Sequence, residues 1–107
     1  MKENLMKAIT EELEFNTEIG EYYVNSSSID YNRIILTIID KDNEFDVTSV
    51  DCKLDKIVNK DNFELQVVYR KSVWHKSFNS LGDLVDNIES AISFLKDCAI
   101  SVIKKLD

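Results

Sequence analysis

The strongest hydrophobic pattern lies in the last quarter of the chain. Twelve apolar residues recur there at helical spacing, on one face that spans roughly 140° of the helix circumference: Leu81, Leu84, Val85, Ile88, Ala91, Ile92, Leu95, Cys98, Ala99, Val102, Ile103 and Leu106. Ser80 can cap a helix, and Asp83 resembles its partner in a capping box. The pattern predicts one long amphipathic helix over residues 81–106. Phe94 and Ile100 lie off the stripe, where they either contact the N-terminal helix or mark a self-association surface.

A narrower helical stripe occupies the N-terminus. Four apolar residues recur there at helical spacing: Leu5, Met6, Ile9 and Leu13. Asn16 and Thr17 end the pattern, which predicts a helix over residues 2–14. Because the stripe is narrow, this helix must pack on the rest of the protein to persist.

From about Glu18 to Phe78 the pattern is typical of strands. Ile19–Val24 predicts a short strand, and the serines of Ser26–Ser28 predict a turn. Tyr31–Ile39 predicts the central strand, because its apolar residues face both ways, as in a strand covered on both faces over part of its length.

Two segments share the same turn chemistry, Lys41-Asp42-Asn43 and Lys60-Asp61-Asn62. Each follows a pair of branched apolar residues and precedes an aromatic residue. Aspartate and asparagine tolerate turn dihedrals and bond to their own backbone, so both segments predict hairpin turns.

The remaining strand patterns complete a sheet. Phe45–Val58 alternates but changes parity, which predicts a β-bulge near Thr48–Ser49. Phe63–Tyr69 alternates cleanly, and Val73–Phe78 is either a fifth strand or a continuation past a bend. Short connections favour antiparallel neighbours. We therefore predict one α+β domain over residues 1–107, with an N-terminal helix, an antiparallel meander of four or five strands, and a long C-terminal helix packed on the sheet.

Nearly all the net charge lies between Glu11 and Asp46. Ten acids lie there against only two bases, Arg33 and Lys41, so the net charge of these 36 residues is −8. The rest of the chain has a net charge of +1, and the whole chain one of −7. Such a field favours a basic protein partner and disfavours direct contact with nucleic acid or anionic membranes. Nine of these acids are candidate partner-binding residues: Glu11, Glu12, Glu14, Glu18, Glu21, Asp40, Asp42, Glu44 and Asp46. The alternative interpretation is that the charge only keeps the protein soluble.

A metal site in this acidic segment is not expected. The spacing of Asp40, Asp42 and Glu44, with Asp51 at the twelfth position, resembles a calcium loop. Phe45 stands where such a loop needs glycine, and strands replace the flanking helices, so we predict a solvated hairpin turn. Two cysteines and one histidine are too few for a closed zinc site, and two glycines are too few for a nucleotide-phosphate cradle. We expect no metal and no cofactor.

Trp74 lies in the one basic and aromatic stretch, beside Arg70, Lys71, His75 and Lys76. Such surfaces can stack single-stranded nucleic acid, but the net charge of the chain outweighs four basic groups. Three further interpretations are a partner within the protein for the acidic face, a partner contact anchored by Trp74, and a tryptophan in the core under the C-terminal helix. His75 has no serine or cysteine at a nucleophile spacing, so we expect an exposed strand histidine.

Two targeting signals that the sequence lacks bear on the cellular compartment. The N-terminal segment has no apolar signal-peptide core, and no stretch is long enough to span a membrane. We therefore expect a cytoplasmic protein in which Cys52 and Cys98 are buried thiols, with a disulfide as the alternative. Residue types with AT-rich codons predominate, which indicates the genome of a low-GC bacterium, its phage or its plasmid.

No constellation specifies a reaction, so we predict a non-enzymatic protein. The first hypothesis is a stoichiometric inhibitor of a basic, nucleic-acid-handling partner, of the phage anti-defence or toxin-immunity type, whose carboxylates could imitate phosphates. The alternative is a dimeric acidic secretion-type chaperone that holds an effector protein. The sequence leaves open whether the protein is a monomer or a homodimer.

Overall fold

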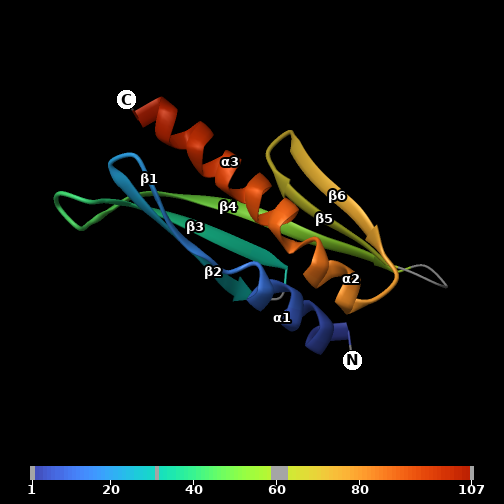
Figure 1. Ribbon diagram of the computed structural model, residues 1–107. Coiled ribbons are helices and arrows are strands. Elements are labelled where there is room, and N and C mark those ends of the chain that lie inside the picture. The colour runs from blue at the N-terminus through green and yellow to red at the C-terminus, as the bar shows by residue number, and fades with distance from the viewer. Residues whose placement is uncertain (1, 31, 59–62, 107) are drawn as a thin grey trace.

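The computed structural model describes residues 2–30, 32–58 and 63–106. Figure 1 labels its elements, which are α1 (Lys2–Glu12), β1 (Asn16–Ile19), β2 (Tyr22–Asp30), β3 (Arg33–Asp40), β4 (Asp46–Val58), β5 (Phe63–Tyr69), β6 (Ser72–Phe78), α2 (Leu81–Asp86) and α3 (Ile88–Leu106). The strands form one antiparallel sheet in chain order, β1-β2-β3-β4-β5-β6. The predicted α+β class and meander are thus confirmed, but the sheet has six strands rather than four or five.

The difference in strand number arises at a turn. The predicted strand Ile19–Val24 is wrong, because Gly20 and Glu21 form a two-residue turn between β1 and β2. Gly20 has a φ of +59°, a left-handed conformation that glycine adopts without the steric cost of a Cβ. The hairpin turn predicted at residues 41–43 is confirmed, whereas the one predicted at 60–62 lies outside the described residues.

The predicted turn at Ser26–Ser28 is also wrong, since these serines lie within β2. Contacts with residues distant in sequence hold them in the strand. The Ser26 amide donates a hydrogen bond to the Phe15 carbonyl at 2.9 Å, and its hydroxyl donates to the Leu13 carbonyl at 3.3 Å. These bonds replace the local side-chain bonds through which serine favours turns.

The predicted β-bulge occurs within one residue of its expected place. Ile38 pairs with Thr48, but the next residue, Ile39, pairs with Asp46. Val47 is therefore the additional residue of β4. Because of this insertion, the side chain of Asp46 emerges on the same side of the sheet as that of Ile39.

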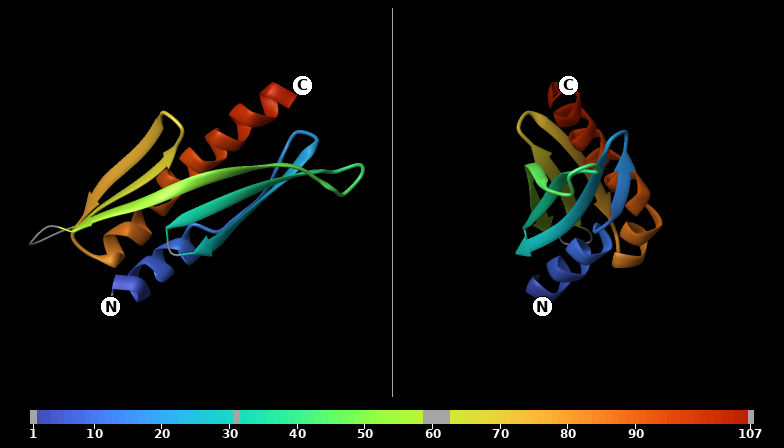
Figure 2. Two further views of the ribbon diagram at one scale, coloured as in Figure 1. Left: turned by 180° about the vertical axis from the view of Figure 1, so that it is seen from behind. Right: turned by 90° about the vertical axis from the view of Figure 1, so that its left-hand side faces the viewer.

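The helices cover one face of the sheet and leave the other open (Figures 1 and 2). Ile34, Leu36 and Ile38 of β3 are fully buried on the covered face, whereas Ile35 and Ile39 are half-buried on the open face. We predicted that this strand is covered on both faces over part of its length. That prediction is wrong, since none of the described helices packs on the open face.

The C-terminal helix is interrupted at Asn87, so the prediction of one helix over residues 81–106 is wrong at that point. The Asn87 amide nitrogen Nδ2 donates to the Asp83 carbonyl at 2.7 Å, and its Oδ1 accepts from Lys76 Nζ at 2.6 Å. Such side-chain bonds compete with the helical backbone pattern. The predicted cap is confirmed, because the Asp83 amide donates to Ser80 Oγ at 3.2 Å.

The hydrophobic stripe packs on the sheet largely as predicted. Seven of its twelve residues are buried in the core: Leu84, Ala91, Ile92, Leu95, Cys98, Ala99 and Ile103. Phe94, off the stripe, is half-buried against the same core. α1 ends two residues earlier than predicted. Ile9 of this helix and Leu13, directly after it, are both fully buried. Among the described helices, none has the length and apolar character needed to cross a membrane.

Candidate functional site

Two hairpin turns lie together at one end of the elongated molecule. The register of β2 and β3 pairs Tyr22 with Asp40, which brings the β1–β2 turn beside the β3–β4 turn. The Lys41 amide donates a hydrogen bond to the Glu21 carbonyl at 3.1 Å, so the two turns are joined through their backbones. Figure 1 shows both turns at the left end, away from α1.

Lys41 joins the hairpins a second time through its side chain. Its Nζ lies 2.8 Å from Glu18 Oε2 and 5.6 Å from the centre of the Tyr23 ring. The hydrogen bond to Glu18 is the main cause that raises the pKa of the lysine ammonium. The ammonium group of the β3–β4 turn is thus occupied within the protein.

The Asp40 carboxylate shapes the turn itself. Its Oδ1 accepts hydrogen bonds from the backbone amides of Asp42 at 2.7 Å and Asn43 at 3.2 Å. The Glu44 amide donates to the Asp40 carbonyl at 2.8 Å, and Glu44 itself adopts a φ of 55°. This Asx-type arrangement fixes the loop, so the carboxylates of Asp42 and Glu44 project from a defined backbone.

Six carboxylates from the predicted set gather at this end, and we call them the acidic tip: Glu18, Glu21, Asp40, Asp42, Glu44 and Asp46. All except Asp40 are exposed. A row of directly paired residues crosses the open face here, from Glu18 through Tyr23 and Ile39 to Asp46. Paired residues share one side of a sheet, so two acids flank an aromatic and an aliphatic side chain.

Two aromatic residues of the tip are exposed, Phe45 by 54% and Tyr23 by 40%. The sequence reasoning assigned both to strands and missed them as surface features. For Phe45 the available signal was its place directly after a turn, where strand pairing ends. A shallow depression of about 420 Å³ adjoins Tyr23, and its described lining is Asn16, Thr17, Glu18, Tyr23 and Asn25.

The other three predicted acids lie elsewhere, and we call Glu11, Glu12 and Glu14 the helix-end acids. Glu14 Oε1 accepts hydrogen bonds from the Ser28 amide at 3.2 Å and from its hydroxyl at 3.0 Å. Ser28 is six residues along β2 from Tyr22, a separation of roughly 20 Å at the rise of a strand. The nine candidate residues therefore form two surfaces rather than one.

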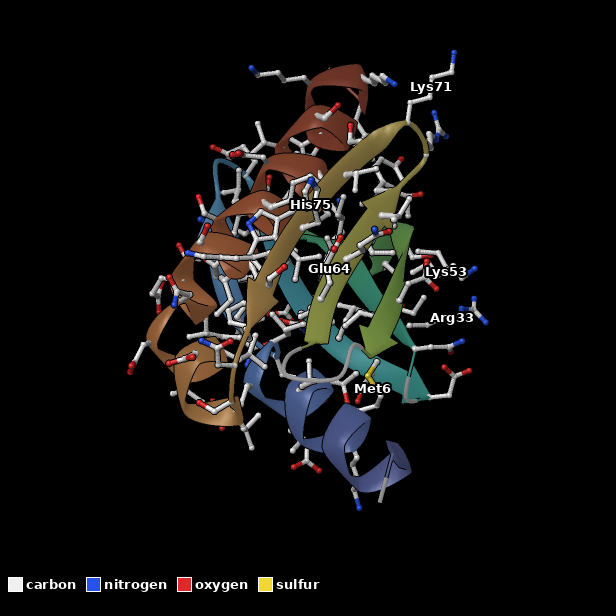
Figure 3. All side chains as sticks on the ribbon, turned by 90° about the vertical axis from the view of Figure 1, so that its right-hand side faces the viewer. Met6, Arg33, Lys53, Glu64, Lys71 and His75 are labelled. Atoms are coloured by element: carbon white, nitrogen blue, oxygen red, sulfur yellow. The ribbon has the colours of Figure 1, made fainter. Side chains whose placement is uncertain are left out.

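Trp74 lies beside α3 at the margin of the core, so the core interpretation holds only in part. It is half-buried against the core, and its indole Nε1 donates to Ser90 Oγ at 3.1 Å. The next residue, His75, is exposed on the opposite side of β6, with Nδ1 3.5 Å from Glu64 Oε1 (Figure 3). Strand alternation thus separates the tryptophan from the histidine, so the basic and aromatic stretch does not form a single patch.

The two cysteines are buried free thiols, as predicted. Cys52 comes from β4 and Cys98 from α3, and both belong to the core. The pKa of the Cys52 thiol is raised, chiefly by its hydrogen bond with Cys98 and then by burial.

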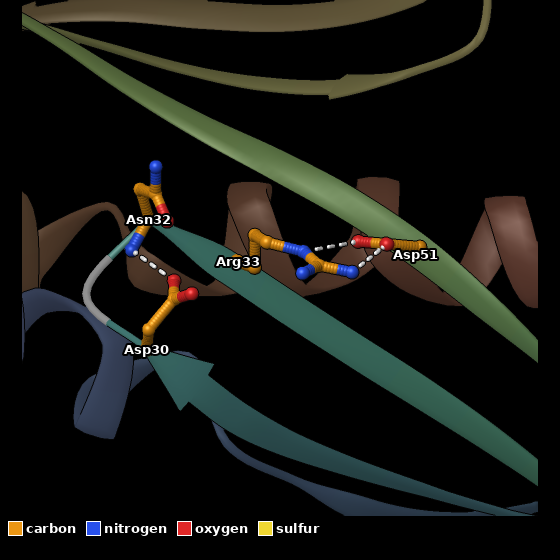
Figure 4. A network of polar contacts seen from close by, with 4 residues as sticks. All are labelled: Asp30, Asn32, Arg33 and Asp51. Atoms are coloured by element: carbon orange, nitrogen blue, oxygen red, sulfur yellow. Dashed lines mark hydrogen bonds and ion pairs between the residues drawn. The ribbon is translucent and has the colours of Figure 1, made fainter.

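The residues that resembled a calcium loop make other contacts. Asp40 bonds to the backbone of its turn, while Asp51 forms a two-point ion pair with Arg33 (Figure 4). Within the described ranges, no group of three histidine, cysteine, aspartate or glutamate side chains is arranged to hold a metal ion.

Comparison with known proteins found no relative of this chain. No family model, no curated protein and no solved structure matches the chain, so its function must be argued from the acidic tip and the fold that presents it.

Proposed function

We propose that this chain is a non-enzymatic binding protein whose acidic tip contacts a basic partner. The observation that carries the proposal is the joining of two hairpins that present six carboxylates together, while the one lysine of their turns, Lys41, is bonded to Glu18. A concentrated negative potential attracts a basic protein over long range and accelerates association.

The tip is held in shape before a partner arrives. The bond from the Lys41 amide to the Glu21 carbonyl joins the two turns. The bonds from two backbone amides to Asp40 fix the β3–β4 turn itself. Preorganisation favours binding because less conformational freedom is lost on association.

The exposed aromatic side chains support protein contact rather than solubility alone. Solubility needs only charge, whereas Tyr23 and Phe45 expose apolar area beside the carboxylates. Aromatic anchors surrounded by polar groups are typical of interface hot spots. The depression lined by Glu18 and Tyr23 suits the aliphatic stem of a lysine or arginine side chain, whose charged end would reach Glu18 Oε1, since Oε2 is bonded to Lys41.

The partner that suits such a surface handles nucleic acid. Proteins that bind phosphate backbones carry clustered lysine and arginine side chains, and fixed carboxylates can occupy those groups in place of phosphates. We propose that the chain acts as a stoichiometric inhibitor in this way, of the phage anti-defence or toxin-immunity type.

The experiment compares two variants of equal charge. Asp42→Lys/Glu44→Lys alters the tip, and Glu11→Lys/Glu12→Lys makes the same charge change on the helix-end acids. Each variant serves as bait for partner capture, followed by measured binding of the captured protein. We expect loss of binding by at least tenfold in the tip variant, or about 1.4 kcal/mol, and near wild-type binding in the other. Equal binding by wild type and tip variant would contradict the proposal.

A secretion-type chaperone is the second candidate, favoured by one observation. Leu81 and Val85 lie one helical turn apart on α2 and are exposed by 38% and 42%. Apolar contact with an effector would persist in salt, whereas binding through the tip should weaken steeply between about 0.05 M and 0.5 M salt. Salt dependence therefore separates the two candidates.

A further inference from the structure

A second charged feature lies on the open face of the sheet, at the other end of β3 from the acidic tip. Arg33 begins this strand and Asp40 ends it, so the two features are roughly 23 Å apart at the rise of a strand. A shallow depression of about 380 Å³ is found here, and its described lining is Asn32, Arg33, Asp51, Lys53, Val68 and Arg70.

The lining of this depression is positive in a chain that is negative overall. It holds three cationic side chains and one carboxylate, so its formal charge is +2, against −7 for the whole chain. Arg33 and Lys53 project side by side from paired positions on β3 and β4 (Figure 3). Asp55 lies beside Lys53, with Oδ1 3.6 Å from Nζ, but it is outside the lining.

Two of the cations are held in place by neighbours. Arg33 donates from Nε and Nη2 to the two oxygens of Asp51, which orients the guanidinium and leaves Nη1 outside the ion pair (Figure 4). The Arg70 guanidinium carbon lies 5.4 Å from the centre of the Tyr69 ring. Both arginines are thus oriented without a ligand.

The backbone at Arg70 adds an independent observation. Arg70 adopts a φ of 55° in the turn between β5 and β6, a conformation that favours glycine. A residue with a Cβ is strained there, and such strain concentrates at functional positions. The corresponding position of the β1–β2 turn is Gly20. Arg70 therefore places a cationic side chain where the backbone conformation favours glycine.

We propose that this depression binds a phosphate group, either inorganic phosphate or the terminal phosphate monoester of a small molecule. A phosphate monoester carries about −1.5 to −2 charges at neutral pH, which matches the formal charge of the lining. Arginine offers paired donors to phosphate oxygens, and Lys53 adds a mobile point charge. Val68 supplies an apolar wall for the group that bears the phosphate. This site is separate from the acidic tip and does not depend on the function proposed above.

The test uses inorganic phosphate and a nucleoside 5′-monophosphate as probes, at an ionic strength held constant with chloride. Binding is followed by backbone amide NMR shifts in the full chain. Lys53→Gln/Arg70→Gln removes two lining charges, and the control Lys71→Gln/Lys105→Gln removes two exposed charges outside the depression. Melting curves of both variants establish that they fold.

We expect saturable shifts at Arg33, Lys53 and Arg70, affinity at least tenfold weaker in the lining variant, and near wild-type affinity in the control. Tighter binding of the nucleotide assigns the natural ligand to a phosphate monoester, and equal binding of the two probes assigns it to the phosphate group alone. Either result supports the site. Shifts no larger than with chloride, or equal weakening in the control, would overturn the proposal.

Discussion

Lys41 and Glu18 are 23 residues apart in sequence, yet Nζ and Oε2 lie 2.8 Å apart and join the two hairpins of the acidic tip. The Glu18 side chain is exposed by 60%, so this pair contributes little to global stability. Its consequence is local, since it holds β1 and the β3–β4 turn in one orientation.

Replacing the ammonium should therefore leave the fold intact and loosen the tip. In Lys41→Met we expect a nearly unchanged melting temperature and faster hydrogen exchange at the amide of residue 41, which donates to the Glu21 carbonyl. The pKa of Lys41 is raised in the folded state, so its stabilising effect is present below the unfolded pKa and is lost as pH rises through the folded value. Any difference in melting temperature between wild type and Lys41→Met should begin to shrink above about pH 10.4 and vanish once the pH exceeds the raised folded pKa. A difference that grows with pH would contradict this assignment.

Leu95 is fully buried under the sheet, and its truncation should be costly. We expect Leu95→Ala to lower the free energy of unfolding by about 2–5 kcal/mol, because the cavity in a packed core closes only in part. Ile88→Ala should cost less, since Ile88 is half-buried. The matched control is Leu106→Ala, a 41% exposed leucine of the same helix, with an expected loss below about 1 kcal/mol. Chemical denaturation measures all three, and equal losses at Leu95 and Leu106 would contradict the packing described here.

The predictable parts of the fold are those set by local periodicity. The dense apolar run from Ile34 to Ile39 marks β3. The helical spacing of the apolar stripe marks α3, because a buried helix face imposes its period on the sequence. The missed features depend on distant contacts. Ser26 is in a strand because of its bonds to the end of α1, and the helix breaks at Asn87, whose side chain bonds to Lys76 on β6.

The sequence predicts that the candidate site is acidic, but it does not predict how the acidic residues are arranged on the surface. The excess of acids between residues 11 and 46 is visible in the sequence, and it includes the six carboxylates of the tip. Its division into two surfaces follows from the register of β2, which places Glu14 beside Ser28 and Asp40 beside Tyr22. Register depends on the packing of the whole sheet, so no local signal reveals it.

The cap of α2 gives a test of a local prediction. In Ser80→Ala the hydrogen bond from the Asp83 amide to Ser80 Oγ is lost, and we expect the free energy of unfolding to fall by about 1 kcal/mol. Ser101→Ala, an exposed position within α3, is the control and should change stability by less than about 0.5 kcal/mol. Thermal and chemical denaturation should agree. No loss at Ser80 would mean that another group caps the helix in solution.

Metal ions should not stabilise the acidic turn. Asp40 Oδ1 is occupied by two backbone amides, and both oxygens of Asp51 are bonded to Arg33. Calcium would have to displace these bonds before it gained carboxylate ligands. We expect thermal melting curves in EDTA, calcium, magnesium and zinc to coincide, with sodium chloride at equal ionic strength as the control. A rise of several degrees with calcium, abolished in Asp42→Asn, would show a cation site in the tip.

The thiol of Cys52 provides the last test, and it reports on the core beneath β4. Burial and the hydrogen bond with Cys98 raise the pKa of this thiol, so it stays neutral where an exposed cysteine ionises. Labelling by an aromatic disulfide reagent needs the thiolate and access to it. We therefore expect native protein to label slowly at pH 7, with only a small acceleration at pH 9, and unfolded protein to label both cysteines at once. Since unfolding returns the Cys52 thiol to its ordinary pKa, the contribution of Cys52 to stability should decline as pH rises above about 8.5. Rapid labelling of the native protein at pH 7 would mean that α3 does not seal this part of the core.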